Sequence, residues 1–419
     1  MKVLVVGKGG REHALVYGLA QSGAEVIATE TNPGMARLAR SLDLAPTDCP
    51  GILAAAQREA VDLVVIGPEA PLVLGLADLL RRHGIATFGP DRAAAALEAS
   101  KDFTKQFLNR HAIPTARHVT VRSLQEALAE LPSFTQPPVV KADGLAAGKG
   151  VVVPESWAEA EAALHAFLGA RTLGDAGAVV VLEERLSGPE ISALALCDGA
   201  SILPLDLARD HKRIFDGDRG DNTGGMGAVS PLPQVSAAVR AQIDREVLAA
   251  TLAGLRRDGL EFRGVLYAGI MLTADGPKVL EYNVRFGDPE AQVLIPRLGA
   301  SLLALLHASA TGSLAAQSLP LDAPAAVTVV LAAAGYPGQP RLGDPITGLE
   351  RAAQVPNVLV FHAGTRLVGE TTVTAGGRVL AVTGLGADVR QARDCAYAAA
   401  AHIEFAGKQL RTDIAASAL

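Results

Sequence analysis

Short apolar runs alternate with segments of helical length over the first 90 residues of the chain. We predict strands in the apolar runs, at residues 3–7, 25–29, 62–67 and 86–89. We predict helices between them, at residues 11–22, 51–60 and 71–84. Strand and helix in alternation are typical of an α/β protein with a parallel, doubly wound sheet. A turn-forming Gly-Pro-Asp predicts a domain boundary near Asp91.

The pattern beyond this boundary is mixed. Helices are predicted at residues 100–111, 123–131 and 156–169. Separate strands are predicted at residues 118–121, 179–186, 190–197 and 201–205. Two further segments, 137–153 and 262–286, each contain two apolar runs joined by a glycine-containing connection. Both connections are too short for a crossover helix, so we expect antiparallel hairpins.

The last part of the chain, beyond about residue 322, has a third pattern. Apolar strands are predicted at residues 325–335, 358–364 and 377–386, and an alanine-rich helix closes the chain. This order predicts a small α+β domain.

The clearest candidate for chemistry is the segment PKVLEYNVRFGDPE, residues 277–290. On a strand, Glu281, Asn283 and Arg285 project to one face, while Leu280, Tyr282, Val284 and Phe286 project to the other. A carboxylate and an amide oxygen are the hard ligands that Mg²⁺ takes, and a guanidinium beside them could hold a phosphate or a developing oxyanion. A solvated strand with an incidental ion pair fits the same alternation.

A second candidate is the glycine-rich loop KADGLAAGKG, residues 141–150. Gly144, Gly148 and Gly150 allow the backbone to approach a phosphate, and Lys141 and Lys149 add positive charge. The loop lacks the Ser or Thr that follows the lysine of a Walker A motif. It predicts either a flexible flap over a nucleotide triphosphate or a plain hairpin turn.

A third candidate is the polar, glycine-rich segment 210–231. Long loops without secondary structure are uncommon in compact domains unless they bind a ligand or are disordered. Asn222, Thr223 and the glycine backbone nearby offer donors suited to a small polar substrate. An exposed, mobile loop is the alternative.

Three weaker candidates lie at predicted strand ends. Glu69 follows the third predicted strand, where open α/β sheets bind their ligands, although it could also begin a helix. Glu183 and Glu190 could frame an adenosine, or be solvated. Near the N-terminus, Gly7 and Gly9 match the first two glycines of a dinucleotide-binding loop, but Glu12 takes the place of the third.

Composition narrows the class of ligand. The chain has 38 basic and 44 acidic residues and a net charge of −6, so it has no basic field for nucleic acid or an anionic membrane. Its three cysteines are far apart and predict buried thiols in a reducing compartment. We see no apolar run approaching about 18 residues and no signal-peptide core. We therefore expect a cytoplasmic enzyme that holds a small ligand by local charges.

The motifs together carry a family resemblance that spans almost the whole chain in one order. They are GKGGREHAL, GPEAPLVLGLAD, SKDFTKQFL, KADGLAAGKGV, DHKR with DNTGGMGAVSP, YAGIML with LEYNVRFGDPEAQVL, AAAGYPGQPRLGD, VFHAGT and GGRVLAVTGLG. The chain closely resembles the phosphoribosylamine-glycine ligases, also called glycinamide ribonucleotide synthetases, of the ATP-grasp superfamily. Two positions depart from the family pattern, because Asp221 stands where Pro is expected and Tyr282 where Phe is frequent.

The resemblance implies an architecture and a reaction. It implies a Rossmann-like N-terminal domain at residues 1–100, an ATP-grasp domain at 101–322 with an inserted lid at about 120–188, and a C-terminal domain at 323–419. Glycine, 5-phosphoribosylamine and ATP would be the substrates, and glycyl phosphate the intermediate. The products would be glycinamide ribonucleotide, ADP and phosphate, with Mg²⁺ or Mn²⁺ as cofactor and a monomer or weak homodimer as the assembly.

The resemblance also implies residue roles. The metal ligands would be Glu281 and Asn283, and the catalytic residues Arg285 and Lys141. The residues that bind ATP would be Lys105, Lys141, Gly144, Gly148, Lys149, Gly150, Glu183, Leu186 and Glu190. The residues that bind the other substrates would be Gly9, Gly10, Glu69, Asp210, Asn222, Thr223, Gly224, Gly225, Met226, Arg285 and Asp288. The amides around Gly9 and Gly10, at a helix N-terminus, would face the phosphate of phosphoribosylamine.

Other functions fit part of the sequence. Another ATP-grasp carboxylate-amine ligase or a carboxylase would share the glycine-rich loop and the Glu281 strand. A nicotinamide-dependent oxidoreductase would use the N-terminal glycine loop but leave the Glu281 strand unexplained. A non-catalytic ATP-binding regulator would not need Glu281, Asn283 and Arg285 together.

Overall fold

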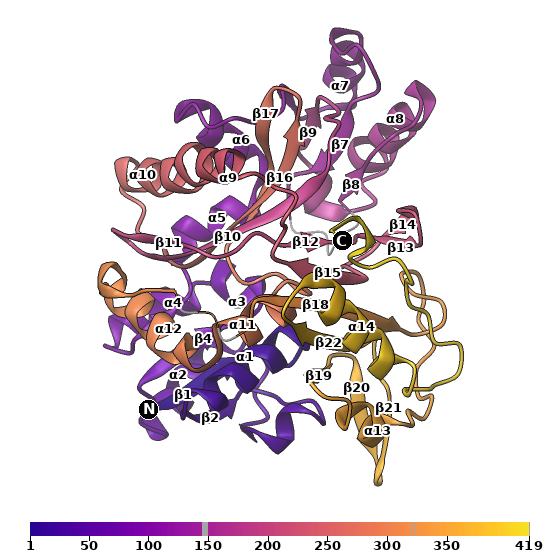
Figure 1. Cartoon of the computed structure of the whole chain (residues 1–419). Helices are drawn as coiled ribbons and strands as arrows, with labels where there is room; N and C mark the ends of the chain where they lie inside the picture. The colour runs from indigo at the N-terminus through magenta and orange to yellow at the C-terminus, as the bar shows by residue number, and fades with distance from the viewer. Residues whose placement is uncertain (145–149, 320, 322, 419) are drawn as a thin grey trace.

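The computed structural model describes residues 1–144, 150–319, 321 and 323–418 (Figure 1). The predicted site residues Gly148 and Lys149, and with them most of the predicted flap, lie outside the described residues.

The N-terminal part is a parallel five-stranded sheet in the order β3-β2-β1-β4-β5, as the alternating pattern predicts. Its strands are β1 (Lys2–Val6), β2 (Glu25–Ala28), β3 (Arg40–Ser41), β4 (Leu63–Ile66) and β5 (Thr87–Phe88). Its helices are α1 (Gly10–Gln21), α2 (Cys49–Arg58), α3 (Glu69–Val73) and α4 (Leu76–Arg82). The central strands are buried on both faces, which explains their unbroken apolar runs.

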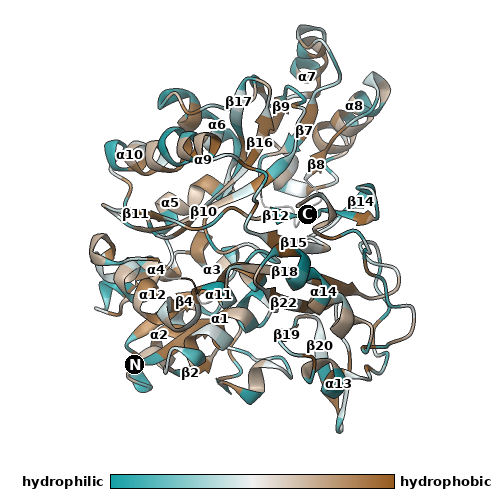
Figure 2. Cartoon of the chain, in the orientation of Figure 1, coloured by the Kyte–Doolittle hydropathy of each residue, from teal (hydrophilic) through white to brown (hydrophobic). Residues whose placement is uncertain are grey.

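The middle of the chain forms a four-stranded antiparallel sheet in the order β11-β10-β16-β17. Its strands are β10 (Glu190–Asp198), β11 (Ile202–Pro204), β16 (Arg263–Thr273) and β17 (Gly276–Asn283). The accompanying helices are α5 (Arg92–Ala99), α6 (Lys101–Arg110), α9 (Ala237–Ile243), α10 (Ala250–Arg257), α11 (Ala291–Leu298) and α12 (Leu302–Thr311). Helix α12 packs between this sheet and the N-terminal part, whereas α11 packs against α1. Hydrophobic residues concentrate on the central strands (Figure 2).

A second four-stranded sheet, here called the lid sheet, projects beyond the body of the molecule (Figure 1). It has the order β6-β9-β7-β8, with β6 (His118–Val121), β7 (Val139–Ala142), β8 (Val151–Val152) and β9 (Val180–Glu183). Helices α7 (Leu124–Glu130) and α8 (Trp157–Leu164) cover it and give it a hydrophobic core of its own. Its strands β7 and β8 are antiparallel, as the short connection predicts.

The polar segment 210–231 is not the structureless loop that its composition suggested. It contains β13 (Arg213–Phe215), β14 (Arg219–Asn222) and β15 (Gly227–Ser230), and β12 (Arg209–Asp210) begins just before it. Strands β13 and β14 form a hairpin whose turn has left-handed backbone at Gly217 and Asp218, with φ of 70° and 52°. The prediction was wrong because these short strands lack the alternation of apolar and polar residues that indicates a strand in a sequence. They form because they hydrogen-bond to neighbouring strands.

The C-terminal part shares a sheet with the middle of the chain. Its strand β18 (Ala325–Ala332) pairs with β15 on one edge and with β22 (Arg378–Gly386) on the other. The sheet has the order β12-β15-β18-β22-β19, with β19 (Val358–His362) at its end. Strands β20 (Thr365–Val368) and β21 (Thr371–Thr374) form a separate hairpin, and helices α13 (Leu349–Ala353) and α14 (Val389–Ala400) complete this part. The sheet therefore crosses the boundary predicted at residues 322 and 323.

Two expectations from composition need correction. The helical segment Ala291–Thr311 is long and apolar enough to cross a membrane by length and composition, although no such run was expected. Its window is 67% buried inside the protein, which is typical of a core helix. Among the cysteines, Cys197 is buried as predicted, but Cys49 and Cys395 are partly exposed.

The α11 helix is tied to the shared sheet by a buried arginine. Arg297, 2% exposed at its side chain, donates to Ser230 Oγ at 2.6 Å and to the carboxylate of Asp206 at 2.5 Å. It also donates to the carbonyl oxygens of Ala323 and Pro324, just before β18. This side chain therefore joins α11 to both β15 and β18.

Replacing Arg297 by Ala should lower the free energy of unfolding by about 1–3 kcal/mol, because it leaves buried oxygen acceptors without their donor. Urea titration followed by circular dichroism measures the effect. Arg257→Ala, at an exposed position on α10, is the matched control and should leave the transition unchanged. An unchanged transition for Arg297→Ala would contradict the role of this side chain.

Candidate active site

Two adjoining cavities of about 390 and 510 Å³ lie between the lid sheet and the central sheet. They share several lining residues, including Glu183, Asp210, Lys212 and Glu281, and form one cleft. The cleft brings together most of the predicted site residues: Glu69, Lys105, Lys141, Gly150, Glu183, Leu186, Glu190, Asp210, Asn222, Thr223, Gly224, Glu281, Asn283, Arg285 and Asp288. Residues from distant parts of the sequence thus converge at one place.

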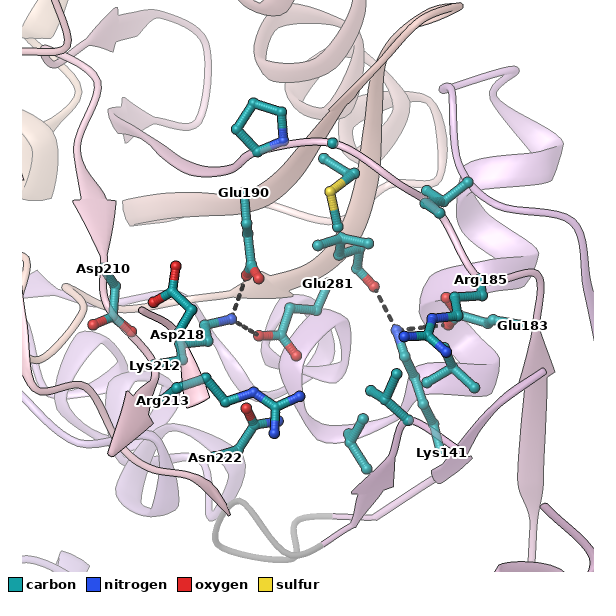
Figure 3. A pocket seen from close by; sticks show the side chains of 18 of the residues that line it. Lys141, Glu183, Arg185, Glu190, Asp210, Lys212, Arg213, Asp218, Asn222 and Glu281 are labelled. Atoms are coloured by element: carbon teal, nitrogen blue, oxygen red, sulfur yellow. Dashed lines mark hydrogen bonds and ion pairs between the residues drawn. The ribbon is translucent and has the colours of Figure 1, made fainter. Parts of the chain in front are cut away.

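The smaller cavity combines apolar walls with charged ends. Its apolar lining comes from both sheets and includes Val139, Val153, Leu186, Met271 and Leu280. Figure 3 shows Lys141, Glu183 and Arg185 at one end and the labelled side chains from Asp210 to Asn222 at the other. An apolar slot with polar ends suits a flat heteroaromatic base that carries a charged tail.

Two lysines and a glutamate form a buried cluster between the lid sheet and the body. Glu183, 2% exposed at its side chain, lies 3.1 Å from the Lys105 ammonium on α6 and 2.9 Å from the Lys141 ammonium on β7. Lys141 also donates to the carbonyl oxygen of Leu280 at 3.1 Å. Burial acts to raise the pKa of Glu183, but the two lysines hold it below its usual value. The Glu183 side chain is therefore an ionised partner of the lysines.

The strand predicted to carry the metal ligands, β17, contains an irregularity that alternation did not reveal. Gly269 pairs with Glu281 and Ile270 with Val279, so Leu280 is an extra, bulged residue. Leu280 consequently lines both cavities beside Glu281, and the prediction that it faces away from them was wrong. The strand also ends at Asn283, so Arg285 belongs to the turn that follows. The bulge leaves the Leu280 carbonyl oriented toward Lys141.

Glu281 lies among cations that keep it ionised. Burial acts to raise its pKa, but Lys212, Lys141 and Lys101 lower it below its usual value. The Lys212 ammonium lies between Glu281, at 3.7 Å, and Glu190, as the dashed lines of Figure 3 show. Burial acts to lower the pKa of Lys212, but these carboxylates raise it far above its usual value.

The donor set at Glu281 fits a hard divalent cation. Within the described ranges, no group of three or more His, Cys, Asp or Glu side chains is placed to hold a metal ion unaided. Glu281 and Asn283 both line the larger cavity and offer two oxygens. A Mg²⁺ ion that takes one or two protein oxygens completes its shell with water and substrate phosphates.

The Arg285 guanidinium is held in place by two glutamates. Glu98, on α5, accepts a hydrogen bond from Arg285 at 2.7 Å and another from the Val284 backbone N–H at 2.8 Å. Glu69 lies 3.5 Å from the Arg285 Nε atom. Burial acts to lower the pKa of Arg285, but Glu98 and Glu69 raise it, so the guanidinium stays charged at the cleft surface.

The far end of the larger cavity is rich in carboxyl groups. Glu290 accepts hydrogen bonds from the hydroxyls of Tyr267, at 2.5 Å, and Ser192, at 2.9 Å. Burial and the nearby Glu290 raise the pKa of Asp210 well above its usual value. The Oδ1 atom of Asp210 is buried and has no hydrogen-bond partner within the described part of the chain. These groups could receive an ammonium or amine ligand.

The N-terminal glycine loop is occupied by carboxylates. Glu12 accepts from the Gly9 N–H at 2.6 Å, and a side chain at Gly7 would collide with it. The Arg11 backbone N–H bonds the Asp288 carboxylate and helps to lower the pKa of that group against the effect of burial. Neither Gly9 nor Gly10 is among the lining residues of the two cavities. Glu12 therefore fills space that a dinucleotide phosphate would need.

Three other predicted residues are not among those that line the cleft. Gly144 packs against Ala176, and a side chain there would meet it at 2.8 Å. Met226 is fully buried against Ile214 and Ala332. Gly225, with φ of 111°, packs against the side chains of Asp210 and Pro289.

Sequence reasoning also missed several cleft residues. They are Glu98, Lys101, Lys212, Tyr267 and Glu290. Four of them, Lys101, Lys212, Tyr267 and Glu290, lie within quoted motifs but were not singled out there. Glu98 lies outside the quoted motifs and gains its place through a contact with Arg285, 187 positions away.

Three family models match consecutive parts of the chain. They are the N domain of phosphoribosylglycinamide synthetase at residues 1–98, its ATP-grasp (A) domain at 99–291, and its C domain at 326–417. The fold and the cleft thus define an ATP-grasp enzyme. More narrowly, the chain belongs to the phosphoribosylglycinamide synthetase family.

Full-length relatives agree with the family models. A phosphoribosylamine–glycine ligase of Ralstonia nicotianae is 47% identical over 99% of this chain and 98% of its own length. One from Phenylobacterium zucineum is 48% identical and covers 100% of both chains. The crystal structure of the phosphoribosylamine–glycine ligase of Thermotoga maritima superposes with a TM-score of 0.87 at 35% identity, over 99% of this chain and 100% of that one.

More distant structures share the fold alone. A biotin carboxylase domain from Hydrogenobacter thermophilus has a TM-score of 0.73 at 17% identity, over 98% of this chain and 91% of that one. The full-length relatives are phosphoribosylamine–glycine ligases, so they favour that family over the carboxylase and oxidoreductase alternatives. The expected α/β architecture with an N domain, an ATP-grasp domain and a C domain is confirmed.

Lys105 makes the charge of the cleft sensitive to pH. Burial lowers the pKa of this lysine to about 8, although Glu183 acts against the shift. A lysine is uncharged above its pKa, so we expect kcat/KM for ATP to fall above about pH 8 as the positive charge facing the phosphates is lost. Initial rates between pH 6 and about 10 measure this profile.

Lys105→Arg is the matched control, because a guanidinium remains charged throughout this range. The fall above about pH 8 should then move to higher pH. A profile that is identical in the two proteins would assign the titration to another group.

Proposed function

We propose that the chain ligates glycine to 5-phosphoribosylamine in this cleft at the expense of ATP. The observation that carries the proposal is the convergence of Glu281, Asn283 and Arg285 with buried lysines, in a chain of the phosphoribosylglycinamide synthetase family. The activity is that of a phosphoribosylamine–glycine ligase in purine biosynthesis.

We assign the smaller cavity to ATP. Adenine would lie in the apolar slot near Leu186, and Glu190 would receive the ribose hydroxyls. Lys105 and Lys141 would then face the phosphates. The shared border of the two cavities at Glu281 supports this order, since it places the γ-phosphate next to the larger cavity.

We assign the larger cavity to glycine and phosphoribosylamine. Its carboxyl groups, Asp210 among them, suit the ammonium of glycine, and Thr223 and Gly224 offer polar contacts, with Asn222 beside them in the smaller cavity. Glu69 and Asp288 lie toward the N-terminal part and would contact the phosphoribosylamine. The amide of Gly9 would reach its phosphate once Glu12 releases it, with the Gly10 amide beside it.

In the proposed reaction, a carboxylate oxygen of glycine attacks the γ-phosphorus of ATP, the bond to the β-phosphate oxygen breaks, and ADP leaves. The amine of phosphoribosylamine then attacks the acyl carbon, inorganic phosphate leaves, and the nitrogen loses a proton. Arg285, fixed by Glu98 and Glu69, would neutralise charge on the transferred phosphoryl group and on the tetrahedral intermediate. Lys141 would hold the phosphates in line.

Glu281 and Asn283 are proposed to hold Mg²⁺ or Mn²⁺. A divalent ion bound there would supply charge neutralisation to the ATP phosphates. Lys212 now bridges Glu281 and Glu190, so its ammonium would share Glu281 with the cation. A cytoplasmic location and a monomeric or weakly dimeric state stay predictions from the sequence.

A direct assay tests the function. The protein is mixed with Mg-ATP, glycine and freshly generated phosphoribosylamine, and ADP is measured with each substrate omitted in turn. We expect ADP formation to require both glycine and the amine. ADP released with bicarbonate in place of glycine would instead favour a carboxylase.

Glu281→Gln tests the metal assignment. We expect turnover to fall about a hundredfold or more, because charge neutralisation at the phosphates is worth several kcal/mol. Glu350→Gln, at an exposed position on α13, is the matched control and should keep full activity. Normal turnover of Glu281→Gln at ordinary Mg²⁺ would remove this residue from the metal site.

A further inference from the structure

Two side chains of the C-terminal part grip the segment 222–226, here called the substrate loop, from outside the cleft. The Tyr336 hydroxyl accepts a hydrogen bond from the Gly224 N–H at 2.9 Å. The Arg378 guanidinium donates to the Gly224 carbonyl oxygen. Both polar groups of one residue in the loop are thus bonded by the C-terminal part.

Arg378 also connects the loop to Asp288. It donates to the Asp288 carbonyl oxygen at 2.6 Å and lies 3.4 Å from the Asp288 carboxylate. Burial acts to lower the pKa of Arg378, but Asp288 raises it, so the side chain stays charged. One guanidinium therefore sets the distance between the two segments proposed to hold different substrates.

The packing around this contact leaves little room for a side chain at two glycine positions, Gly224 and Gly377. A Cβ atom on Gly224 would lie 3.0 Å from the Arg378 guanidinium carbon. A Cβ atom on Gly377 would meet the Tyr336 ring at 2.2 Å. The ring in turn packs against the cluster that contains Met226. The motifs GYPG and GGR, which the proposed reaction does not use, supply this contact.

We propose that Arg378 and Tyr336 are positioning residues for the substrate loop and Asp288, so that the C-terminal part builds the amino-acid and amine sites. The inference rests on the proposed function. Neither side chain is among the lining residues of the two cavities, so both act through the backbone they hold. Asn222 of the substrate loop also lines the smaller cavity, but Lys141 and the apolar slot belong to the lid sheet and the central sheet, so KM for ATP should change least.

The test compares Arg378→Ala, Arg378→Lys and Tyr336→Phe with wild type by steady-state kinetics. For Arg378→Ala we expect KM for glycine and for phosphoribosylamine to rise about tenfold or more, the worth of a charged hydrogen bond, with a much smaller change in KM for ATP. Arg378→Lys should recover part of the loss. Arg366→Ala, at an exposed position on β20, is the matched control.

Hydrogen exchange supplies a readout that does not depend on activity. Tyr336→Phe removes the acceptor of the Gly224 N–H, so exchange in the substrate loop should speed up while exchange in the lid sheet stays the same. If Arg378→Ala does not fold, Arg378→Lys and Tyr336→Phe decide the question. Unchanged KM values in these folded variants, or an equal rise in KM for ATP, would overturn the inference.

The wild-type assay separates the two proposals. ADP formation that does not depend on glycine would refute the proposed function, whatever the KM values of the variants. Glycine-dependent turnover that is insensitive to Arg378 and Tyr336 would refute only the positioning role.

Discussion

Two buried ammonium groups share the carboxylate of Glu183, and the relation between the lid sheet and the body depends on this cluster. Lys105 belongs to the body, whereas Lys141 and Glu183 belong to the lid sheet. The excess positive charge is stable in a buried place only because Glu281 and other carboxylates lie nearby. The fold therefore places positive charge in the cleft before an anionic substrate binds. This arrangement is electrostatic preorganisation.

The charged groups that line the cleft are also separated by the sign of their charge. Positive charge dominates where the lysines meet β17, and carboxyl groups dominate around Asp210 and Glu290. Arg285 lines the same cavity and is fixed by glutamates from the N-terminal half of the chain. A reaction that moves a phosphoryl group toward an amino acid needs this gradient, because the anionic and cationic ligands must sit side by side without exchanging places.

The sequence predicted features that depend on local pattern. The parallel N-terminal sheet, the β16–β17 hairpin and the Glu281 strand follow from apolar runs and turns. The bulge at Leu280 could not be predicted, because it is defined by the register of the opposing strand. The hairpin of residues 213–222 was missed because polar strands carry no apolar period. Arg378 was missed because its contact with Gly224 joins residues 154 positions apart.

The shared sheet sets the order in which the chain can be completed. Strand β15 pairs with β18, which leaves the ribosome much later, so β15 has an unpaired edge during synthesis. Such long-range pairing slows folding and exposes intermediates to aggregation. The loop that precedes β15 gains its final support only when β22 has docked beside β18. Assembly of the proposed substrate site is thus coupled to a late stage of folding. A nascent chain that lacks β22 lacks the contact that positions the substrate loop.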